Sequence, residues 1–256
     1  ATLELHTVRP GPAEAANYVR NRIAPADPPH ATVHVLLWRR ADAPLRGQDG
    51  RTPGAPLAAL VVASPHATCY GHENHQADGD YPGVLQRRLA EAWGCPVLFA
   101  AGAVGSMGPA ETAPRGPRCA TAVGQSIADA ATEALATSRR RGSRRSNALD
   151  AALLDVDLPP LQYRLGHRWR LSPVAARYLH GRRTYVHVLR LGPAMLLGMP
   201  CDYSGELAAA LERWADEACP GLTPIITSFN GDYIGYVLPR RRYGLDHYEA
   251  RDMNLF

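Results

Sequence analysis

Short apolar runs alternate with longer segments of helical pattern along this chain, and that alternation restricts its fold more than any other feature. Apolar runs of strand length occupy residues 31–39, 57–64, 96–101, 184–190, 194–198 and 223–228. Helices are predicted over residues 81–93, 118–138 and 203–218. Strands that alternate with helices at this spacing predict an α/β fold with a largely parallel central sheet covered by helices.

Composition narrows the classes of protein to which the chain can belong. No apolar run reaches the roughly 18–20 residues needed to cross a bilayer, so we predict no transmembrane segment. All 28 basic residues are arginine, which excludes Schiff-base and other lysine-dependent chemistry. The net charge of +4 gives no sign of a nucleic-acid partner. The only charge run, RRRGSRRS at 139–146, is interpreted as a solvated loop, and residues 46–56 as a surface loop.

The length of the chain, 256 residues without an internal repeat, predicts a single α/β domain over residues 1–256. Its five cysteines are widely spaced and include no C-x-x-C pair, which excludes a zinc knuckle and favours buried, reduced thiols. The chain opens with ATLELHTV, in which no signal-peptide pattern is visible. The residues alone therefore leave the compartment open.

The side chains best suited to chemistry follow predicted strands, which is where ligands bind in α/β sheets. His66 comes directly after the buried run 57–64, at the start of a loop rich in histidine and acidic residues. Histidine is the commonest zinc ligand in proteins, and we single out His66 as a candidate ligand. His72 and His75 of the same loop are interpreted as histidines that face water.

Three later segments add further candidates. The turn LFAAGAVGSMGP at 98–109 allows close approach of the backbone but lacks phosphate-loop spacing. In GMPCDYSGE at 198–206, Asp202 can ligate a metal, whereas Glu206 is interpreted as a solvated residue in the first turn of a helix. Four tyrosines recur after residue 228, and phenols can ligate a metal or donate to an oxyanion. Ordinary packing of the aromatic rings is the alternative.

Taken in order, these segments resemble the neutral, non-lysosomal ceramidase family from about residue 20 to the end of the chain. HATCYG at 66–71 matches the family's H-x-T-x-x-G, and DYPG at 80–83 matches its D-[FY]-P-G. The turn up to Pro109 and GMPCD at 198–202 are similar to the next two motifs, the second of which is G-x-P-x-E. The tyrosine-rich end resembles its N-x-Y-x-x-Y and R-Y-E stretch.

The resemblance implies a ceramidase-like catalytic domain, a zinc-dependent hydrolase of an N-acyl amide in a lipid-like substrate. By position it gives His66, Asp202 and Tyr236 as Zn²⁺ ligands. It gives Tyr248 the role of a catalytic phenol that supports the oxyanion, and Tyr233 is a second candidate catalytic phenol. The family is often exported, so the resemblance leaves an extracytoplasmic location open, and the compartment stays unknown.

The chain departs from the family pattern in three places. Asp202 replaces a glutamate, and Gly102 and Ser106 stand where ceramidases carry serine and aspartate. Nothing matches the H-x-H-S-G-P segment that holds another zinc histidine and the general base. We therefore expect the C-terminal part of a larger catalytic unit, with a second polypeptide that supplies the H-x-H pair. Acyl transfer in place of hydrolysis stays open, and the alternative is a metal-free family member that serves as a binding or scaffold subunit.

Overall fold

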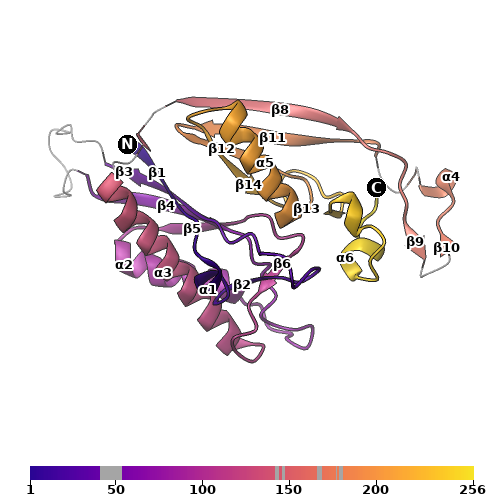
Figure 1. Cartoon of the computed structure of the whole chain (residues 1–256), viewed down its shortest axis with the longest axis horizontal. Helices are drawn as coiled ribbons and strands as arrows, with labels where there is room; N and C mark the ends of the chain where they lie inside the picture. The colour runs from indigo at the N-terminus through magenta and orange to yellow at the C-terminus, as the bar shows by residue number, and fades with distance from the viewer. Residues whose placement is uncertain (41–53, 142–143, 146–147, 166–168, 177, 179–180) are drawn as a thin grey trace.

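The computed structural model describes residues 1–256 except 41–53, 142–143, 146–147, 166–168, 177 and 179–180. Two main sheets form the centre of the molecule, and the longer helices pack against them (Figure 1). The order and direction of the strands in these sheets determine where the predicted site residues meet.

The first sheet has the strand order β5-β4-β3-β1-β7. Its strands are β1 (Thr2–Val8), β3 (Val33–Arg39), β4 (Pro56–Ala63), β5 (Val97–Ala101) and β7 (Arg144–Arg145). The pairs β1–β3 and β3–β4 are antiparallel, whereas β4 and β5 are parallel. Helix α2 (Asp80–Trp93) joins the parallel pair and ends at Gly94 in the left-handed conformation that glycine adopts without strain.

The second sheet has the order β14-β12-β11-β8. Its strands are β8 (Leu149–Asp157), β11 (Arg183–Leu191), β12 (Ala194–Gly198) and β14 (Thr223–Thr227). The pairs β8–β11 and β11–β12 are antiparallel, and β12 and β14 are parallel. Helix α5 (Gly205–Ala218) joins the parallel pair and begins with the Ser204 hydroxyl accepting a hydrogen bond from the amide of Leu207.

The prediction of a largely parallel sheet is wrong, because both sheets are mixed. Each contains one strand–helix–strand unit, which the apolar pattern located. Antiparallel strands extend both units: β3, β1 and β7 in the first sheet, and β11 and β8 in the second. β1 and β8 are strands that the pattern did not indicate at all. Apart from β7, the two sheets therefore share one connectivity. Along the chain, each has two antiparallel strand pairs and then a parallel pair whose strands are joined by a helix.

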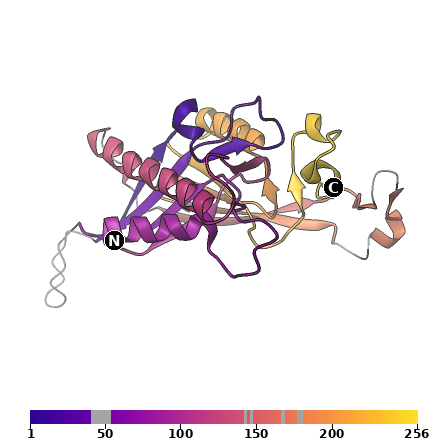
Figure 2. The ribbon, with the colours of Figure 1, turned by 90° about the horizontal axis from the view of Figure 1, so that it is seen from below.

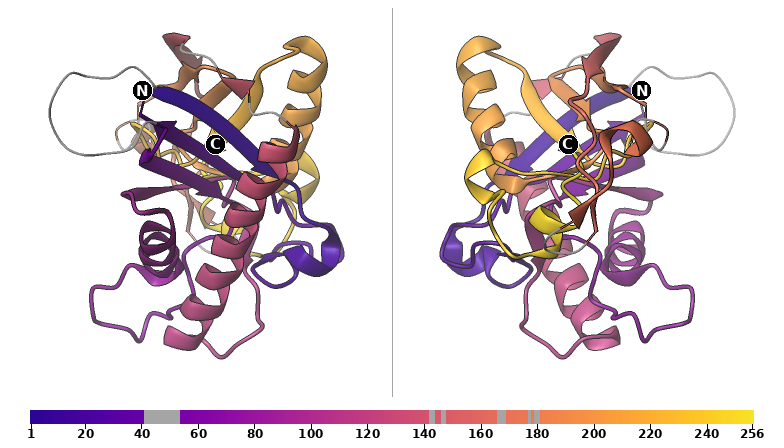
Figure 3. Two further views of the ribbon diagram at one scale, coloured as in Figure 1. Left: turned by 90° about the vertical axis from the view of Figure 1, so that its left-hand side faces the viewer. Right: turned by 90° about the vertical axis from the view of Figure 1, so that its right-hand side faces the viewer.

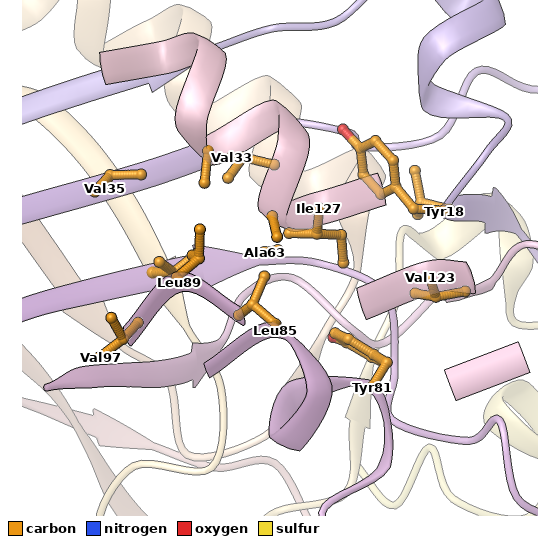
Figure 4. Close-up of a cluster of buried hydrophobic side chains, with 14 of the residues drawn as sticks. Tyr18, Val33, Val35, Ala63, Tyr81, Leu85, Leu89, Val97, Val123 and Ile127 are labelled. Carbon is orange, nitrogen blue, oxygen red and sulfur yellow. The ribbon is translucent and has the colours of Figure 1, made fainter. Parts of the chain in front are cut away.

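Helices α2 and α3 (Pro117–Arg141) cover one face of the first sheet. Val33 of β3, Leu85 of α2 and Ile127 of α3 are completely buried in the cluster between them (Figure 4). Figure 3 shows these helices on the side of the first sheet that faces away from the second sheet. This cluster is the largest apolar core of the described residues.

Two smaller clusters complete the core. Leu36 and Val62 of the first sheet pack against Ile225 of the second, so the sheets are joined face to face. Ala208 of α5 packs with Leu197 of β12, which fixes that helix on the second sheet. The two crossover units are therefore held in one arrangement.

Short elements connect the main ones. They are α1 (Pro12–Ala15), β2 (Val19–Asn21), β6 (Met107–Pro109), β9 (Arg164–Leu165), β10 (Trp169–Arg170), α4 (Pro173–Ala176), β13 (Asp202–Tyr203), β15 (Tyr236–Val237), a 3₁₀ turn (Arg240–Arg242) and α6 (Tyr248–Arg251). The segment with β9, β10 and α4 lies at one end of the elongated molecule, away from both sheets (Figure 2).

The predicted loops are only partly observed as loops. In the charge run at 139–146, α3 continues to Arg141 and β7 pairs with β1, so the interpretation as a solvated loop is wrong for those parts. Residues 142–143 and 146 lie outside the described residues. The same is true of 46–53 in the predicted surface loop 46–56, and Pro56 already begins β4.

No helix among the described residues is both long and apolar enough to cross a membrane. The five cysteines are free thiols, and four of them are buried. Burial and the neighbouring Asp202 charge raise the pKa of the Cys201 thiol to about 12, so this thiol is protonated at neutral pH.

Candidate functional site

Equivalent loops of the two crossover units converge at the predicted site. β4 ends at Ala63 and leads to His66, and β12 ends at Gly198 and leads to Asp202. Both residues precede the crossover helix of their unit. Asp202 then pairs in parallel with Tyr236 in the short ladder of β13 and β15. The shared connectivity of the sheets thus brings together segments that are far apart in the sequence.

His66 and Asp202 face each other directly. Nε2 of His66 lies 3.4 Å from Oδ1 of Asp202, and the Asp202 side chain is only 2% exposed, against 23% for His66. Oδ1 of Asp202 has no hydrogen-bond donor among the described residues. Burial of a carboxylate oxygen is costly unless a donor or a cation compensates it. The position of Oδ1 therefore suits a positively charged group.

Tyr233 binds the other oxygen of the same carboxylate. Its hydroxyl donates a hydrogen bond to Oδ2 of Asp202 at 2.6 Å. Burial, together with this hydrogen bond to the carboxylate, raises the pKa of the Tyr233 phenol above its ordinary value. The phenol thus keeps its proton at neutral pH and acts as a donor that orients Asp202.

Tyr236 and Tyr248 form an aromatic pair beside Asp202. Their ring centroids are 5.9 Å apart, with the rings edge to face. Tyr236 is buried, and burial together with the Asp202 charge raises the pKa of its phenol to about 12. Tyr248 is 54% exposed, so its ring borders solvent at the edge of the site.

Arg22 joins the site although the sequence analysis did not single it out. Its guanidinium donates to the Tyr236 hydroxyl at 3.2 Å, and its Nε lies 2.9 Å from Oε1 of Glu249. Glu249 is buried and balances the arginine charge. Arg22 precedes Tyr236 by 214 positions, so no local spacing pattern marks it, and only the tertiary fold reveals the contact.

The backbone around the pair is closely packed. Phe229 adopts a left-handed φ of +64°, a conformation that non-glycine residues rarely keep without support from their surroundings. Its ring centroid lies 6.0 Å from that of His66 and 6.3 Å from that of Tyr233. Position 105 requires glycine, because a Cβ there would lie 2.4 Å from the Asp202 carbonyl oxygen. The glycine-rich turn therefore supports the Asp202 segment.

Three other residues of the candidate segments lie apart from the pair. His72 and His75 are exposed, in agreement with their interpretation as histidines that face water. Glu206 differs from its interpretation as a solvated residue, because its side chain is only 10% exposed and its Oε1 lies 3.1 Å from Nε of Arg242. Its charge balances arginines of the 3₁₀ turn.

The structure brings all five predicted site residues into one region, linked through Asp202 and Tyr236. Imidazole nitrogen and carboxylate oxygen are ligands that Zn²⁺ prefers, and Oδ1 of Asp202 is available for a cation. The described part of the chain holds no group of three or more His, Cys, Asp or Glu residues that could bind a metal. This chain therefore fits a partial zinc site, and the ligand and catalytic roles of the five residues stay predictions.

Comparison with solved structures identifies the fold. The chain is similar to the neutral ceramidase from Pseudomonas aeruginosa, with a TM-score of 0.70 and 17% identity, over 97% of this chain and 48% of that one. It is also similar to a ceramidase complexed with C2, with a TM-score of 0.73 and 16% identity, over 100% of this chain and 50% of that one. No family model and no curated protein matches the sequence. The resemblance to neutral ceramidases is confirmed for the fold, and the chain spans about half the length of these structures.

Proposed function

We propose that this chain is the C-terminal part of a zinc-dependent amide hydrolase, or of a related acyl-transfer enzyme, that acts on a lipid-like N-acyl amide. The observation that carries the proposal is the buried Oδ1 of Asp202, which has no donor among the described residues and faces Nε2 of His66 at 3.4 Å. The ceramidase-like fold supports the same reaction class.

Each residue has a defined part in this proposal. His66, Asp202 and Tyr236 would hold Zn²⁺, which when bound supplies a Lewis acid and lowers the pKa of a water molecule toward about 7. Tyr233 keeps the Asp202 carboxylate oriented through its 2.6 Å hydrogen bond. The exposed Tyr248 donates to the amide oxygen as negative charge develops on it.

The proposal includes a second polypeptide with the N-terminal part of the fold and the H-x-H pair. Zinc sites in catalytic centres use three protein ligands or more, and a general base must also reach the attacking water. The described residues offer one imidazole near Asp202, and the proposal assigns that imidazole to the metal. The general base, and the further zinc histidine that the resemblance implies, would therefore come from the second polypeptide. The solved structures, about twice as long as this chain, are consistent with such a partner.

The test is hydrolysis by the assembled protein from its native source. We expect release of the amine from an N-acyl amide, loss of that activity with a chelator, and recovery with Zn²⁺. His66→Ala and Asp202→Ala should each remove activity and zinc, whereas His75→Ala, which changes an exposed histidine of the same loop, should leave both unchanged. Hydrolysis that survives either site substitution would contradict the proposal.

The second candidate function is a metal-free scaffold or binding subunit. The observation that favours it is the lack of a metal-binding group of His, Cys, Asp and Glu in the described part of the chain. An assembled protein that contains no zinc, hydrolyses no amide and keeps its fold in Asp202→Ala would support this role instead.

A further inference from the structure

A buried chain of hydrogen bonds connects the loop that carries His66 to helix α5, which follows Asp202. Nδ1 of His30 lies 2.7 Å from Oγ of Ser64, and Nε2 of His30 lies 2.9 Å from Oε1 of Glu212. Ser64 is 2% exposed, and the side chains of His30 and Glu212 are 7% and 9% exposed. We call Ser64, His30 and Glu212 the His30 relay.

The partners of the relay determine where its protons lie. The amide of Ala103 donates to Oγ of Ser64 at 3.1 Å, so the Ser64 hydroxyl can donate its own proton to Nδ1 of His30. Nε2–H of His30 then donates to Glu212. Burial alone would raise the pKa of Glu212, but its hydrogen bond with His30 and the nearby Arg9 charge lower it, so the carboxylate stays ionised. Each hydrogen bond of the relay then has a donor and an acceptor.

The relay contains the residue types of a catalytic triad, but the structure gives its serine no access to a substrate. A cavity of about 470 Å³ opens beside His30 and Glu212. Ser64 does not line this cavity, and Ser64 itself is buried. The relay is therefore suited to hold neighbouring segments in place and not to attack a carbonyl group.

One end of the relay lies beside His66 in the sequence, and the other end lies on the helix that follows Asp202. Ser64 is separated from His66 only by Pro65, whose carbonyl accepts a hydrogen bond from the buried Tyr81 hydroxyl. Glu212 lies on α5, the helix that follows Asp202 after a short connection. One imidazole thus connects the His66 segment to the helix that follows Asp202.

The turn that contributes Ala103 strengthens the same connection. The amide of Gly102 donates to the Ala63 carbonyl at 2.8 Å, and the amide of Gly105 donates to the Tyr203 carbonyl at 2.8 Å. This turn therefore lies between the strand end before His66 and the segment of Asp202. A change at Ser64 acts on the turn and on His30 together.

We propose that the His30 relay sets the distance between His66 and Asp202, and that His30 is a positioning residue for this pair. The effect on zinc binding rests on the proposed function, but the positioning itself is a property of the metal-free chain. Substitution within the relay lets the two loops separate, and it weakens metal binding without removing a ligand.

The first test measures hydrogen exchange in the full metal-free chain. We expect Ser64→Ala to speed amide exchange about tenfold in both segments 64–70 and 198–205, because both lose one shared support. Thr132→Val is the control, since it also removes a hydroxyl that makes a hydrogen bond, which Thr132 donates to the Ala128 carbonyl at 2.8 Å within α3. Unchanged exchange at 198–205 in Ser64→Ala, or equal acceleration there in Thr132→Val, would overturn the proposal.

The second test uses Glu212, so that it does not depend on how well Ser64→Ala folds. Glu212→Gln keeps a carbonyl oxygen that can accept from Nε2–H of His30, whereas Glu212→Leu does not. In titrations of the assembled protein with Zn²⁺ alone, we expect Glu212→Gln to bind like the unsubstituted protein and Glu212→Leu about tenfold more weakly. Equal affinity in Glu212→Leu would contradict the relay. If even the unsubstituted protein binds no zinc, the proposed function fails, and the exchange experiment still decides the relay.

Discussion

The two oxygens of the Asp202 carboxylate have different surroundings, and this difference defines the chemistry of the site. Oδ2 accepts a short hydrogen bond from Tyr233, whereas Oδ1 faces His66 without a donor among the described residues. A carboxylate held by one oxygen and open at the other is a common arrangement for a metal ligand. Arg22 adds a similar support to Tyr236 from the opposite end of the sequence.

The Tyr233 hydrogen bond predicts the effect of its removal. Tyr233→Phe should weaken zinc binding by the assembled protein about tenfold, because Asp202 loses the donor that orients it. Chelator competition measures this affinity. Tyr243→Phe is the control, since Tyr243 has the same 41% exposure as Tyr233. Equal zinc affinity of the two variants would show that the phenol does not orient Asp202.

At this scale the sequence predicted the residues that lie in recognisable motifs. His66, Asp202 and the three tyrosines each lie in a motif, and the structure places them together. Arg22 and His30 could not be predicted, because each acquires its role through partners far along the chain, at separations of 214 and 182 residues. Their local surroundings in the sequence resemble ordinary loops.

At the scale of elements, the two sheets repeat one connectivity although the sequence shows no repeat. The crossover units β4–α2–β5 and β12–α5–β14 were predicted from their apolar runs, because buried parallel strands read as continuous apolar segments. β8 was missed because its apolar run, AALL at 151–154, is short and lies between two aspartates. β1 is a strand with polar residues buried within it, including Glu4 and His6.

The buried His34 of β3 predicts a loss of stability in acid. Burial lowers its pKa from 6.5 to about 4, so the folded state favours the neutral imidazole. This contribution to stability is complete above pH 6.5 and is lost as the pH falls to 4, by about 3 kcal/mol. The free energy of unfolding, measured in urea, should decrease between pH 7 and pH 4 in both proteins. The decrease should be about 3 kcal/mol smaller in His34→Gln than in the unsubstituted protein. Equal losses in the two proteins would contradict the prediction.

The exposed edge strand β8 predicts self-association of the isolated chain. Among the described residues, β8 pairs only with β11 of the second sheet, and its Leu153 and Leu154 are 55% and 53% exposed. Open strand edges with apolar side chains favour pairing between molecules. Leu154→Lys should lower the associated fraction in sedimentation velocity. Val174→Lys is the control, because Val174 is an apolar residue of α4 that is 61% exposed, and it should leave the associated fraction unchanged. Equal effects of the two substitutions would contradict association through β8.

At the scale of the whole molecule, the fold corresponds to about half of the solved ceramidase structures. In agreement with this, the sequence has no counterpart of the segment that holds the other histidines in ceramidases. The described residues agree, since they bring one imidazole to Asp202 and no group of three metal-binding His, Cys, Asp or Glu side chains. The proposed function accordingly includes a second polypeptide.

The most direct test of the account is the zinc content of that assembly together with X-ray absorption at the zinc edge. We expect one zinc per chain, with nitrogen and oxygen ligands, in the unsubstituted protein, and a loss of that zinc in Asp202→Asn while the fold is kept. Zinc retained in full by Asp202→Asn, or an active assembly without zinc, would contradict the claim that His66 and Asp202 hold a metal.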